Sequence, residues 1–211
     1  MAGLLIDRLF PPWGEYLVAG WVWAVFLWLY RRSDRELKAV FLTGLVLAVA
    51  FELFCSEVWK VYEYRGGRLL LYVPPGHVLL YDLGRRLSSS LPQVTLRILP
   101  AVFIPYAVCA GLLGFDTQAI FWLIVFLAFL ALGSSRKFYA TMFLAAMILE
   151  LWGTSLGLWT WKTHVPYFDL TTTNPPLFAG MFYCVGDLAV LTVIRLLKIS
   201  WRRPLTQATL E

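Results

Sequence analysis

Long apolar segments separated by short polar stretches make up most of the chain. A membrane-spanning helix needs roughly 20 mostly apolar residues. Six segments come close to this pattern, at about 16–31, 38–59, 93–114, 117–134, 138–159 and 177–199. A seventh, at about 71–85, is shorter and more polar, and reads LYVPPGHVLLYDLGR. The pattern predicts an all-α polytopic membrane protein in which residues 1–211 form a single transmembrane domain.

The placement of basic residues decides whether the seventh segment crosses the membrane. Lys and Arg concentrate in the cytoplasmic loops of membrane proteins. If the segment crosses, thirteen of the eighteen Lys and Arg fall on one side: Arg31, Arg32, Arg35, Lys38, Arg85, Arg86, Arg97, Arg136, Lys137, Arg195, Lys198, Arg202 and Arg203. We therefore expect seven transmembrane helices in a bacterial inner or plasma membrane, with the N-terminus outside and the C-terminus in the cytoplasm.

Composition agrees with a membrane protein and excludes several other classes. The chain is 60% hydrophobic and 15% charged, whereas soluble domains are about half apolar and about a quarter charged. The net charge of +5 is explained by basic loops, so no nucleic-acid partner is expected. Three cysteines without CxxC spacing argue against a disulfide framework and a zinc cluster. The first residues lack a signal-peptide pattern, and we expect them to form a short amphipathic segment on the membrane surface.

An internal repeat follows from the expected topology. Each copy has a Glu late in an apolar segment, an aromatic pair spaced by one residue, a Pro-Pro pair opening the next segment, and an Asp within it. These residues are Glu52, Tyr62, Tyr64, Pro74, Pro75 and Asp82 in one copy, and Glu150, Trp159, Trp161, Pro175, Pro176 and Asp187 in the other. The pattern predicts a 3+1+3 parallel repeat, with halves at about 16–85 and 117–199 and a linker helix at about 93–114.

Four acidic residues fall within the expected membrane segments. Glu52, for example, lies about 21 Å from the cytoplasmic end of its helix. A carboxyl group in hydrocarbon costs about 2.5–3.5 kcal/mol, so such residues usually mark functional sites. We expect Glu52, Glu150 and Asp187 to converge on one cavity as catalytic residues. Asp82 lies within a turn of Arg85 and Arg86 and can simply pair with them.

Aromatic and polar residues near these acids are candidates for binding a substrate. The expected binding residues are Trp59, Tyr62, Tyr64, Thr154, Trp159, Trp161, Asn174 and Tyr183. Two simpler interpretations stay open. The aromatic residues fit an interfacial belt, and the small residues Gly153, Thr154 and Gly157 below Glu150 fit close helix packing. His77 and His164 are placed near the outer surface without a metal-binding spacing, so no metal site is expected.

Two stretches resemble small integral-membrane enzymes of isoprenoid metabolism, namely the carotenoid-biosynthesis proteins of the cyclase and hydratase type and the membrane terpene cyclases. The stretches are FELFCSEVWKVYEY (51–64) and ELWGTSLGLWTW (150–161). The resemblance implies acid–base roles for Glu52, Glu150 and Asp187. In such chemistry, a protonated carboxyl protonates a polyene double bond or an epoxide, aromatic faces stabilise the cation, and a second carboxylate removes a proton or positions water. The substrate is then an isoprenoid or another lipid, and no cofactor is required.

Two other functions remain open from the sequence. A small-solute transporter of the 3+1+3 kind would use the acids and the outer aromatic residues to bind a polar or cationic solute. A non-catalytic subunit of a membrane complex, or a homo-oligomer, would use the aromatic residues as contact surface. Nucleotide binding and serine-hydrolase chemistry have no support, because GxGxxG, GxxxxGK[ST] and GxSxG are all absent.

Overall fold

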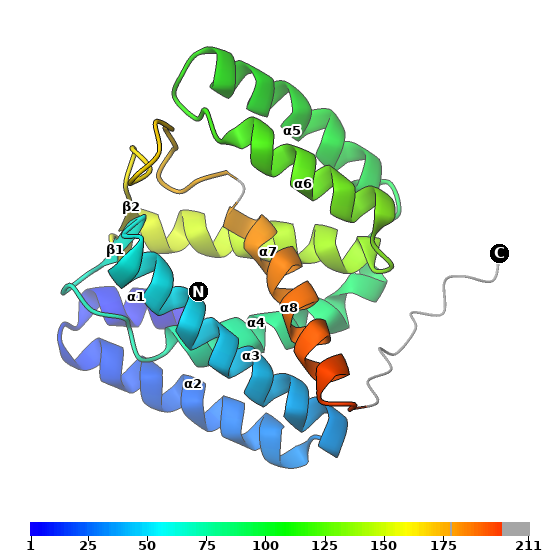
Figure 1. Ribbon diagram of the computed structural model, residues 1–211. Helices are drawn as coiled ribbons and strands as arrows, with labels where there is room; N and C mark the ends of the chain where they lie inside the picture. The colour runs from blue at the N-terminus through cyan, green and yellow to red at the C-terminus, as the bar shows by residue number, and fades with distance from the viewer. Residues whose placement is uncertain (178, 200–211) are drawn as a thin grey trace.

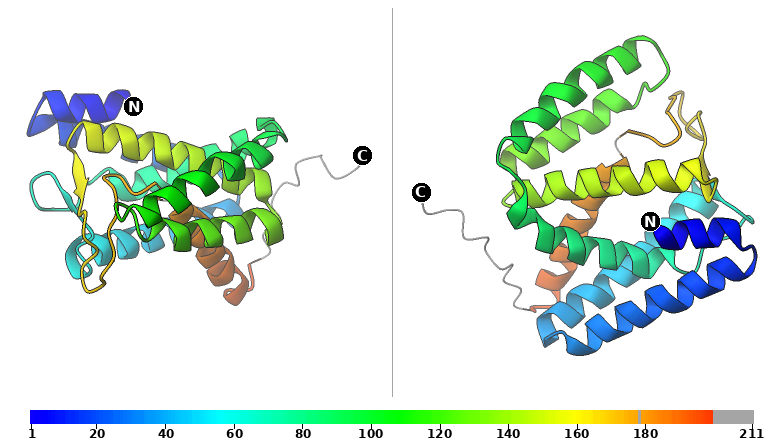
Figure 2. Two further views of the ribbon diagram at one scale, coloured as in Figure 1. Left: turned by 90° about the horizontal axis from the view of Figure 1, so that it is seen from above. Right: turned by 180° about the vertical axis from the view of Figure 1, so that it is seen from behind.

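The computed structural model describes residues 1–177 and 179–199, which fold into helices and one short two-stranded ribbon (Figures 1 and 2). The α-helices are α1 (Ala2–Leu9), α2 (Trp13–Arg32), α3 (Arg35–Leu53), α4 (Val73–Leu87), α5 (Thr95–Leu112), α6 (Ala119–Leu132), α7 (Arg136–Ser155) and α8 (Phe182–Leu196). A π-helical turn (Phe54–Val58) extends α3, and 3₁₀ turns follow α4 (Ser88–Ser90) and precede α8 (Ala179–Met181). The strands are β1 (Tyr62–Tyr64) and β2 (Trp159–Trp161).

Helix α7 lies at the centre of the arrangement. It contacts α4, α5, α6 and α8, so it separates the α5–α6 hairpin from the helices of the first half (Figure 1). Its buried face carries Met142 and Phe143, and the Phe143 ring stacks on that of Phe126 with 4.4 Å between centroids. This packing forms the largest apolar core among the described residues.

The expected helical segments are all occupied by helices. Within the described residues, four helical segments are long and apolar enough to cross a membrane: Arg35–Val58, Thr95–Leu112, Arg136–Ser155 and Ala179–Leu196. Helix α6 is apolar but shorter. The prediction is therefore confirmed in part: the chain is mostly helical and has four helices suited to crossing a membrane, whereas the number of crossings and the 3+1+3 repeat stay predictions.

The N-terminal segment folds as the short helix α1. Its Leu4 and Asp7 side chains are buried, whereas Leu5, Ile6 and Leu9 are exposed. Two ion pairs hold this region to the loop after β1. Arg65 Nη2 lies 2.5 Å from Asp7 Oδ1, and Arg68 binds the Glu15 carboxylate through both of its Nη atoms at 3.0 and 2.8 Å.

Two expectations about local structure were wrong. The segment 138–159 was expected to stay helical to its end, but α7 stops at Ser155 because Gly157, at a φ of +66°, turns the chain out of the helix. Pro175 and Pro176 were expected to open the last helix, as Pro74 and Pro75 do in the first turn of α4. They lie in a turn instead, where the Thr173 hydroxyl donates to the Pro175 carbonyl oxygen, and helical structure resumes at Ala179.

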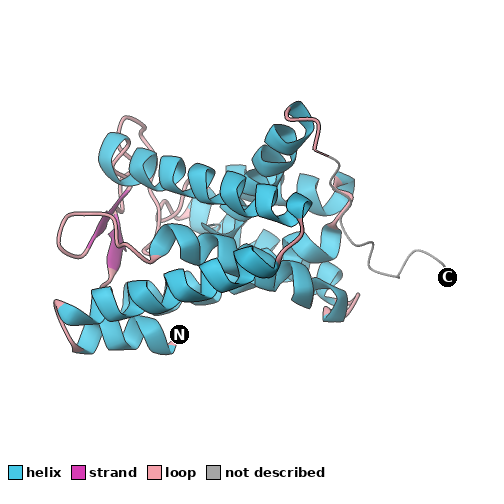
Figure 3. Cartoon of the chain, turned by 90° about the horizontal axis from the view of Figure 1, so that it is seen from below, coloured by secondary structure: helices cyan, strands magenta, loops and turns pink. Residues whose placement is uncertain are grey.

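Strands β1 and β2 pair in antiparallel fashion at one end of the molecule (Figure 3). Tyr62 faces Trp161, Glu63 faces Thr160, and Tyr64 faces Trp159. Side chains alternate between the two faces of a strand, and here the four aromatic residues are buried while Glu63 and Thr160 are exposed. The aromatic pairs that the sequence placed in two repeat copies therefore form one continuous buried face.

Basic residues gather at the opposite end of the molecule. The connections after α2, α4 and α6 all lie away from the ribbon, and α8 runs toward the same end (Figure 1). These connections and the helix ends beside them carry Arg31, Arg32, Arg35, Lys38, Arg85, Arg86, Arg97, Arg136, Lys137, Arg195 and Lys198. Arg202, Arg203 and the expected cytoplasmic segment 203–211 lie outside the described residues.

The connection between α5 and α6 packs on the loop that follows β2. The Thr171 amide donates to Thr117 Oγ1 at 2.8 Å, and the Thr171 hydroxyl donates to the Gly114 carbonyl oxygen at 2.7 Å. Asp116 is buried at this contact, and burial raises the pKa of its carboxyl to about 6, although the nearby Thr172 and Thr173 hydroxyls oppose the shift.

This raised pKa predicts a pH-dependent loss of stability. Between about pH 4 and pH 6 the folded protein holds a proton that the unfolded chain releases, so the free energy of unfolding falls as the pH rises. Asp116→Asn should therefore be more stable than the wild type by about 1–2 kcal/mol at about pH 8, with little difference at about pH 4. Thermal unfolding in detergent measures this, with the exposed Asp169→Asn as control. An equal stability difference at both pH values would contradict the prediction.

Candidate functional site

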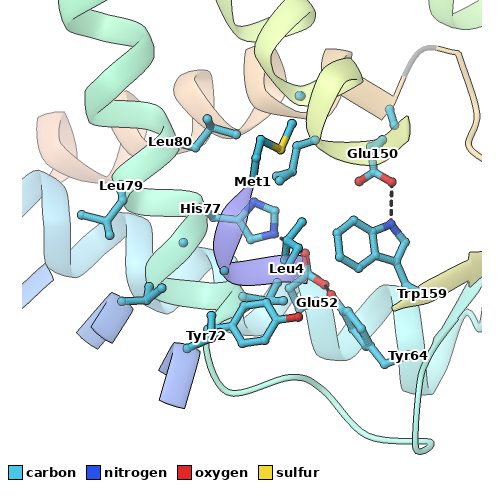
Figure 4. Close-up of a pocket in the computed structure, with 18 of the residues that line it drawn as sticks. Met1, Leu4, Glu52, Tyr64, Tyr72, His77, Leu79, Leu80, Glu150 and Trp159 are labelled. Carbon is cyan, nitrogen blue, oxygen red and sulfur yellow. Dashed lines mark hydrogen bonds and ion pairs between the residues drawn. The ribbon is translucent and has the colours of Figure 1, made fainter. Parts of the chain in front are cut away.

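A cavity of about 670 Å³ lies beside the buried face of the ribbon and is lined mainly by apolar side chains. We call it the carboxylate pocket, after Glu52 and Glu150, which line it together with Tyr62, Tyr64, Tyr72, His77, Trp159, Trp161 and Tyr183. Figure 4 shows Glu52 and His77 together, and Glu150 beside the indole of Trp159. The two Glu residues come from different helices, α3 and α7.

Hydrogen bonds occupy both oxygens of the Glu52 carboxylate. The hydroxyls of Tyr62 and Tyr64 both donate to Oε2, Tyr62 at 2.5 Å. On the other side, Oε1 lies 2.6 Å from His77 Nε2. His77 Nδ1 in turn lies 2.5 Å from the Tyr183 hydroxyl. If Nε2–H donates to Glu52, Nδ1 is left to accept from Tyr183, and the five side chains form one connected network.

The Glu150 carboxyl is bound differently. Trp159 Nε1 and Trp161 Nε1 both donate to Oε2, at 2.7 and 2.9 Å. Within the described part of the chain, no residue forms a hydrogen bond with Oε1. An indole N–H can only donate, so Trp159 and Trp161 cannot accept a proton from this carboxyl. Glu150 therefore has one oxygen without a protein donor, whereas Glu52 has partners on both oxygens and keeps a single lone pair, on Oε1.

The stretch ELWGTSLGLWTW builds this arrangement from local features. A Cβ at Gly153 would lie 2.0 Å from the Trp159 ring, so only glycine leaves room for the indole beside α7. Gly157 then reverses the chain, and Trp159 and Trp161 return toward Glu150 on β2. Asn174 Oδ1 fixes the strand by accepting from the Trp161 amide at 3.0 Å. Gly153 thus has a specific steric role beyond general helix packing.

The two halves of the chain meet at the ribbon. Each Glu accepts hydrogen bonds from the aromatic pair that follows it in the sequence, and the two pairs then contact each other across the strands. The Tyr62 and Trp161 rings have centroids 4.6 Å apart, and the Tyr64 and Trp159 rings are 6.3 Å apart in an edge-on arrangement. This pairing brings Glu52 and Glu150 to one cavity.

Asp187, the third expected catalytic acid, does not line the carboxylate pocket. Its carboxylate accepts from the hydroxyls of Tyr81, at 2.8 Å, and Tyr139, at 3.2 Å, and so joins α8 to α4 and α7. Asp187 borders a smaller neighbouring cavity instead. The expected convergence of acids therefore holds for Glu52 and Glu150 and was wrong for Asp187. Asp82 contacts Arg85 and Arg86, each at 2.7 Å.

Five of the eight expected binding residues line the pocket, and three do not. Tyr62, Tyr64, Trp159, Trp161 and Tyr183 line it. Trp59 lies outside because its indole donates to the Pro166 carbonyl oxygen at 3.1 Å. The Thr154 hydroxyl donates to the Glu150 carbonyl oxygen rather than to the carboxyl, and Asn174 acts on the strand backbone. Residues 163–174, which follow β2, do not line the pocket either.

His77 is the residue that the sequence analysis missed. The sequence suggested a position near the outer surface, but α4 begins at Val73, so His77 begins the second turn of this helix and reaches Glu52. One signal could have found it. In a chain with acidic residues in its membrane segments, a histidine just after a Pro-Pro helix start is a candidate partner for one of those acids.

The pocket combines an apolar lining with two carboxyl groups and one imidazole, and Lys and Arg are absent from its lining within residues 1–177 and 179–199. These groups can donate or accept protons on an apolar ligand bound between them. No protein-family model, no curated protein sequence and no solved structure matches the chain.

Proposed function

We propose that the protein is an integral membrane enzyme that performs acid–base chemistry on an isoprenoid or another unsaturated lipid, of the cyclase or hydratase type. The observation that carries this proposal is the pair of carboxyl groups with unlike hydrogen-bond partners in one apolar cavity. Enzymes obtain an acid and a base from similar side chains by giving them different environments.

The edge of the pocket supports a substrate that arrives from the bilayer. Leu17 and Trp21 of α2 and Leu83 of α4 line the cavity, and they are 65%, 72% and 49% exposed. Large apolar side chains exposed on membrane helices face lipid. A ligand dissolved in the bilayer can therefore reach the carboxylate pocket sideways, between α2 and α4, without crossing water.

Glu150 is assigned the role of the acid. Oε2 is held by the two indoles, and Oε1 is available to carry a proton toward the cavity. Two charged carboxylates with one imidazolium would leave net negative charge in an apolar site, which is costly in a membrane. A proton on Glu150 removes that charge. Its transfer to an alkene carbon uses the π electrons to form a C–H bond and leaves a carbocation on the adjacent carbon.

Glu52 and His77 are assigned the role of the base. The Tyr62 and Tyr64 hydroxyls and His77 all support the charged form of Glu52. Glu52 accepts a proton from the carbon beside the cation, and the electron pair of the broken C–H bond forms a new double bond. In a hydration, water adds to the cation through an oxygen lone pair, and Glu52 accepts a proton from the added water instead. The aromatic faces of the ribbon stabilise the positive charge between these steps.

The proposal includes the seven-helix topology and the repeat. The basic residues gathered at the end opposite the ribbon support a cytoplasmic position for that end, and hence an external N-terminus. Helix α3 contacts α8, and α7 contacts α4. In the proposed repeat α3 corresponds to α7 and α4 corresponds to α8, so these two contacts are equivalent and support it. A rotation about the membrane normal should then bring spans 1–3 onto spans 5–7, with Glu52 and Glu150 in equivalent places.

Transport of a small solute is the second candidate. The duplicated Glu–aromatic arrangement favours it, because transporters often bind substrate where two repeats meet. The largely apolar lining and the lipid-facing edge favour the enzyme. Lipid extracts of cells with and without the protein separate the two, because only an enzyme changes the chemical structure of a lipid.

The central prediction concerns Glu150→Gln. The amide keeps the shape of the side chain and removes its acidity, so product formation should fall by at least about 100-fold, the lower range for loss of a general acid. The measurement is the amount of product in lipid extracts, normalised to the amount of protein in the membrane. Glu63→Gln is the matched control, because this Glu lies on the exposed face of the same ribbon.

Full activity of Glu150→Gln at normal protein level would show that Glu150 is structural and that the catalytic assignment is wrong. A loss of activity in both Glu150→Gln and Glu63→Gln would mean that both substitutions disturb the ribbon, and it would not support an acid role of Glu150.

The topology prediction is tested by cysteine labelling. Ser89→Cys and Thr206→Cys, each in a chain whose Cys55, Cys109 and Cys184 are replaced by alanine, should both react from the cytoplasmic side only. Membrane-impermeant maleimide, applied to intact cells and to inverted vesicles, measures the accessible side. Four helices, α5 to α8, lie between the two positions, so labelling from opposite sides would mean that an odd number of these helices crosses the membrane, which would contradict the seven-helix topology and the repeat.

A further inference from the structure

A second cavity, of about 220 Å³, runs between α3 and α8 next to the carboxylate pocket. On α3 it extends from Val40 past Gly44 to Phe51, and on α8 from Phe182 past Gly186 to Val190. At a rise of about 1.5 Å per residue, the α3 side is about 16 Å long. The cavity is therefore a narrow apolar channel along two helices, and we call it the tail groove.

The tail groove and the carboxylate pocket share part of their lining. Phe51, His77, Phe182 and Tyr183 border both cavities. The Phe51 and Phe182 rings contact each other with 5.3 Å between centroids, and His77 binds Tyr183. The end of the groove at Phe51 thus lies next to Glu52, at the level where the proposed chemistry takes place.

Polar groups at the groove are already engaged with one another. The Tyr81 hydroxyl donates to Asp187, and the Tyr183 hydroxyl binds His77. The remaining surface is formed by aliphatic, aromatic and glycine residues. An apolar chain that lies along the groove therefore displaces no hydrogen bond, whereas a polar solute would gain few partners there.

We propose that one elongated lipid occupies both cavities, with its reactive group between Glu52 and Glu150 and its apolar tail in the tail groove. The proposal rests on the proposed function and adds the substrate class: a single-chain lipid whose tail length is limited by the end of the groove at Val40 and Val190. Two features of the structure carry it, the shared lining at the level of Glu52 and the extension of the groove along α3 and α8.

The glycines allow the groove to be filled without disturbing the fold. A Cβ at Gly186 meets no atom within 4 Å, and at Gly44 the nearest atom is Val78 Cγ2 at 3.5 Å, an ordinary contact. A larger side chain at Gly186 therefore projects into the groove. Gly20 of α2 also has no atom within 4 Å of an added Cβ but does not line either cavity. Gly20→Leu is thus a matched control for Gly186→Leu.

The test measures how binding depends on chain length. Purified full-length protein in detergent is titrated with geraniol, farnesol and geranylgeraniol, which differ by one isoprene unit at each step, and native mass spectrometry gives the bound fraction. Wild type and Gly20→Leu should bind the longest alcohol most tightly. Gly186→Leu should weaken geranylgeraniol binding by about tenfold, or about 1.4 kcal/mol, and leave geraniol binding nearly unchanged.

Each other outcome overturns a defined part of the account. If Gly186→Leu weakens all three alcohols equally, or none of them, the tail groove does not hold the tail, and the proposed function is unaffected. If a co-purified phospholipid is bound by the wild type and lost from Gly186→Leu, the groove belongs to a membrane lipid. If the wild type binds none of the alcohols, both this inference and the proposed isoprenoid substrate are wrong.

Discussion

The antiparallel pairing of β1 with β2 holds the two carboxyl groups of the site in one cavity. Glu52 and Glu150 lie on different helices, and each is bound by an aromatic pair on its own strand. Because the strands alternate their side chains, one register places all four aromatic rings on the buried face. A shift of either strand by one residue would turn its exposed residue, Glu63 or Thr160, inward and release the carboxyl group that this strand binds.

The two carboxyl groups have similar positions beside the ribbon, but their hydrogen-bond donors differ, so the site is asymmetric. Tyrosine hydroxyls and an imidazole surround Glu52 on both oxygens, whereas two indoles bind a single oxygen of Glu150. Tyrosine and histidine can pass protons along a network, and an indole N–H cannot accept one. The two carboxyl groups can thus serve as a base on one side of the cavity and an acid on the other. The proposed chemistry needs both, an acid to protonate the alkene and a base to remove a proton from the resulting cation.

Much of this organisation could be predicted from sequence, because apolar length and repeated spacing are local signals. The helical segments, the special positions of Glu52 and Glu150, and the pairing of Asp82 with Arg85 and Arg86 follow from such signals. The short ribbon could not be foreseen, since three-residue strands next to long apolar helices leave almost no pattern. The contacts of His77 and the separate position of Asp187 depend on how α4 and α8 pack against other helices, which spacing along one helix does not encode.

A disulfide across the ribbon tests the central claim most directly. Directly opposed residues of antiparallel strands have Cα atoms about 4.5–5.5 Å apart, within the range that a disulfide spans. In a chain without its native cysteines, Glu63→Cys with Thr160→Cys should cross-link readily in membranes under mild oxidation, because these residues face each other. The diagonal pair Glu63→Cys with Lys162→Cys should cross-link poorly. Equal cross-linking of both pairs, or none at Glu63 and Thr160 while both thiols react with maleimide, would contradict the pairing that brings the two carboxyl groups together.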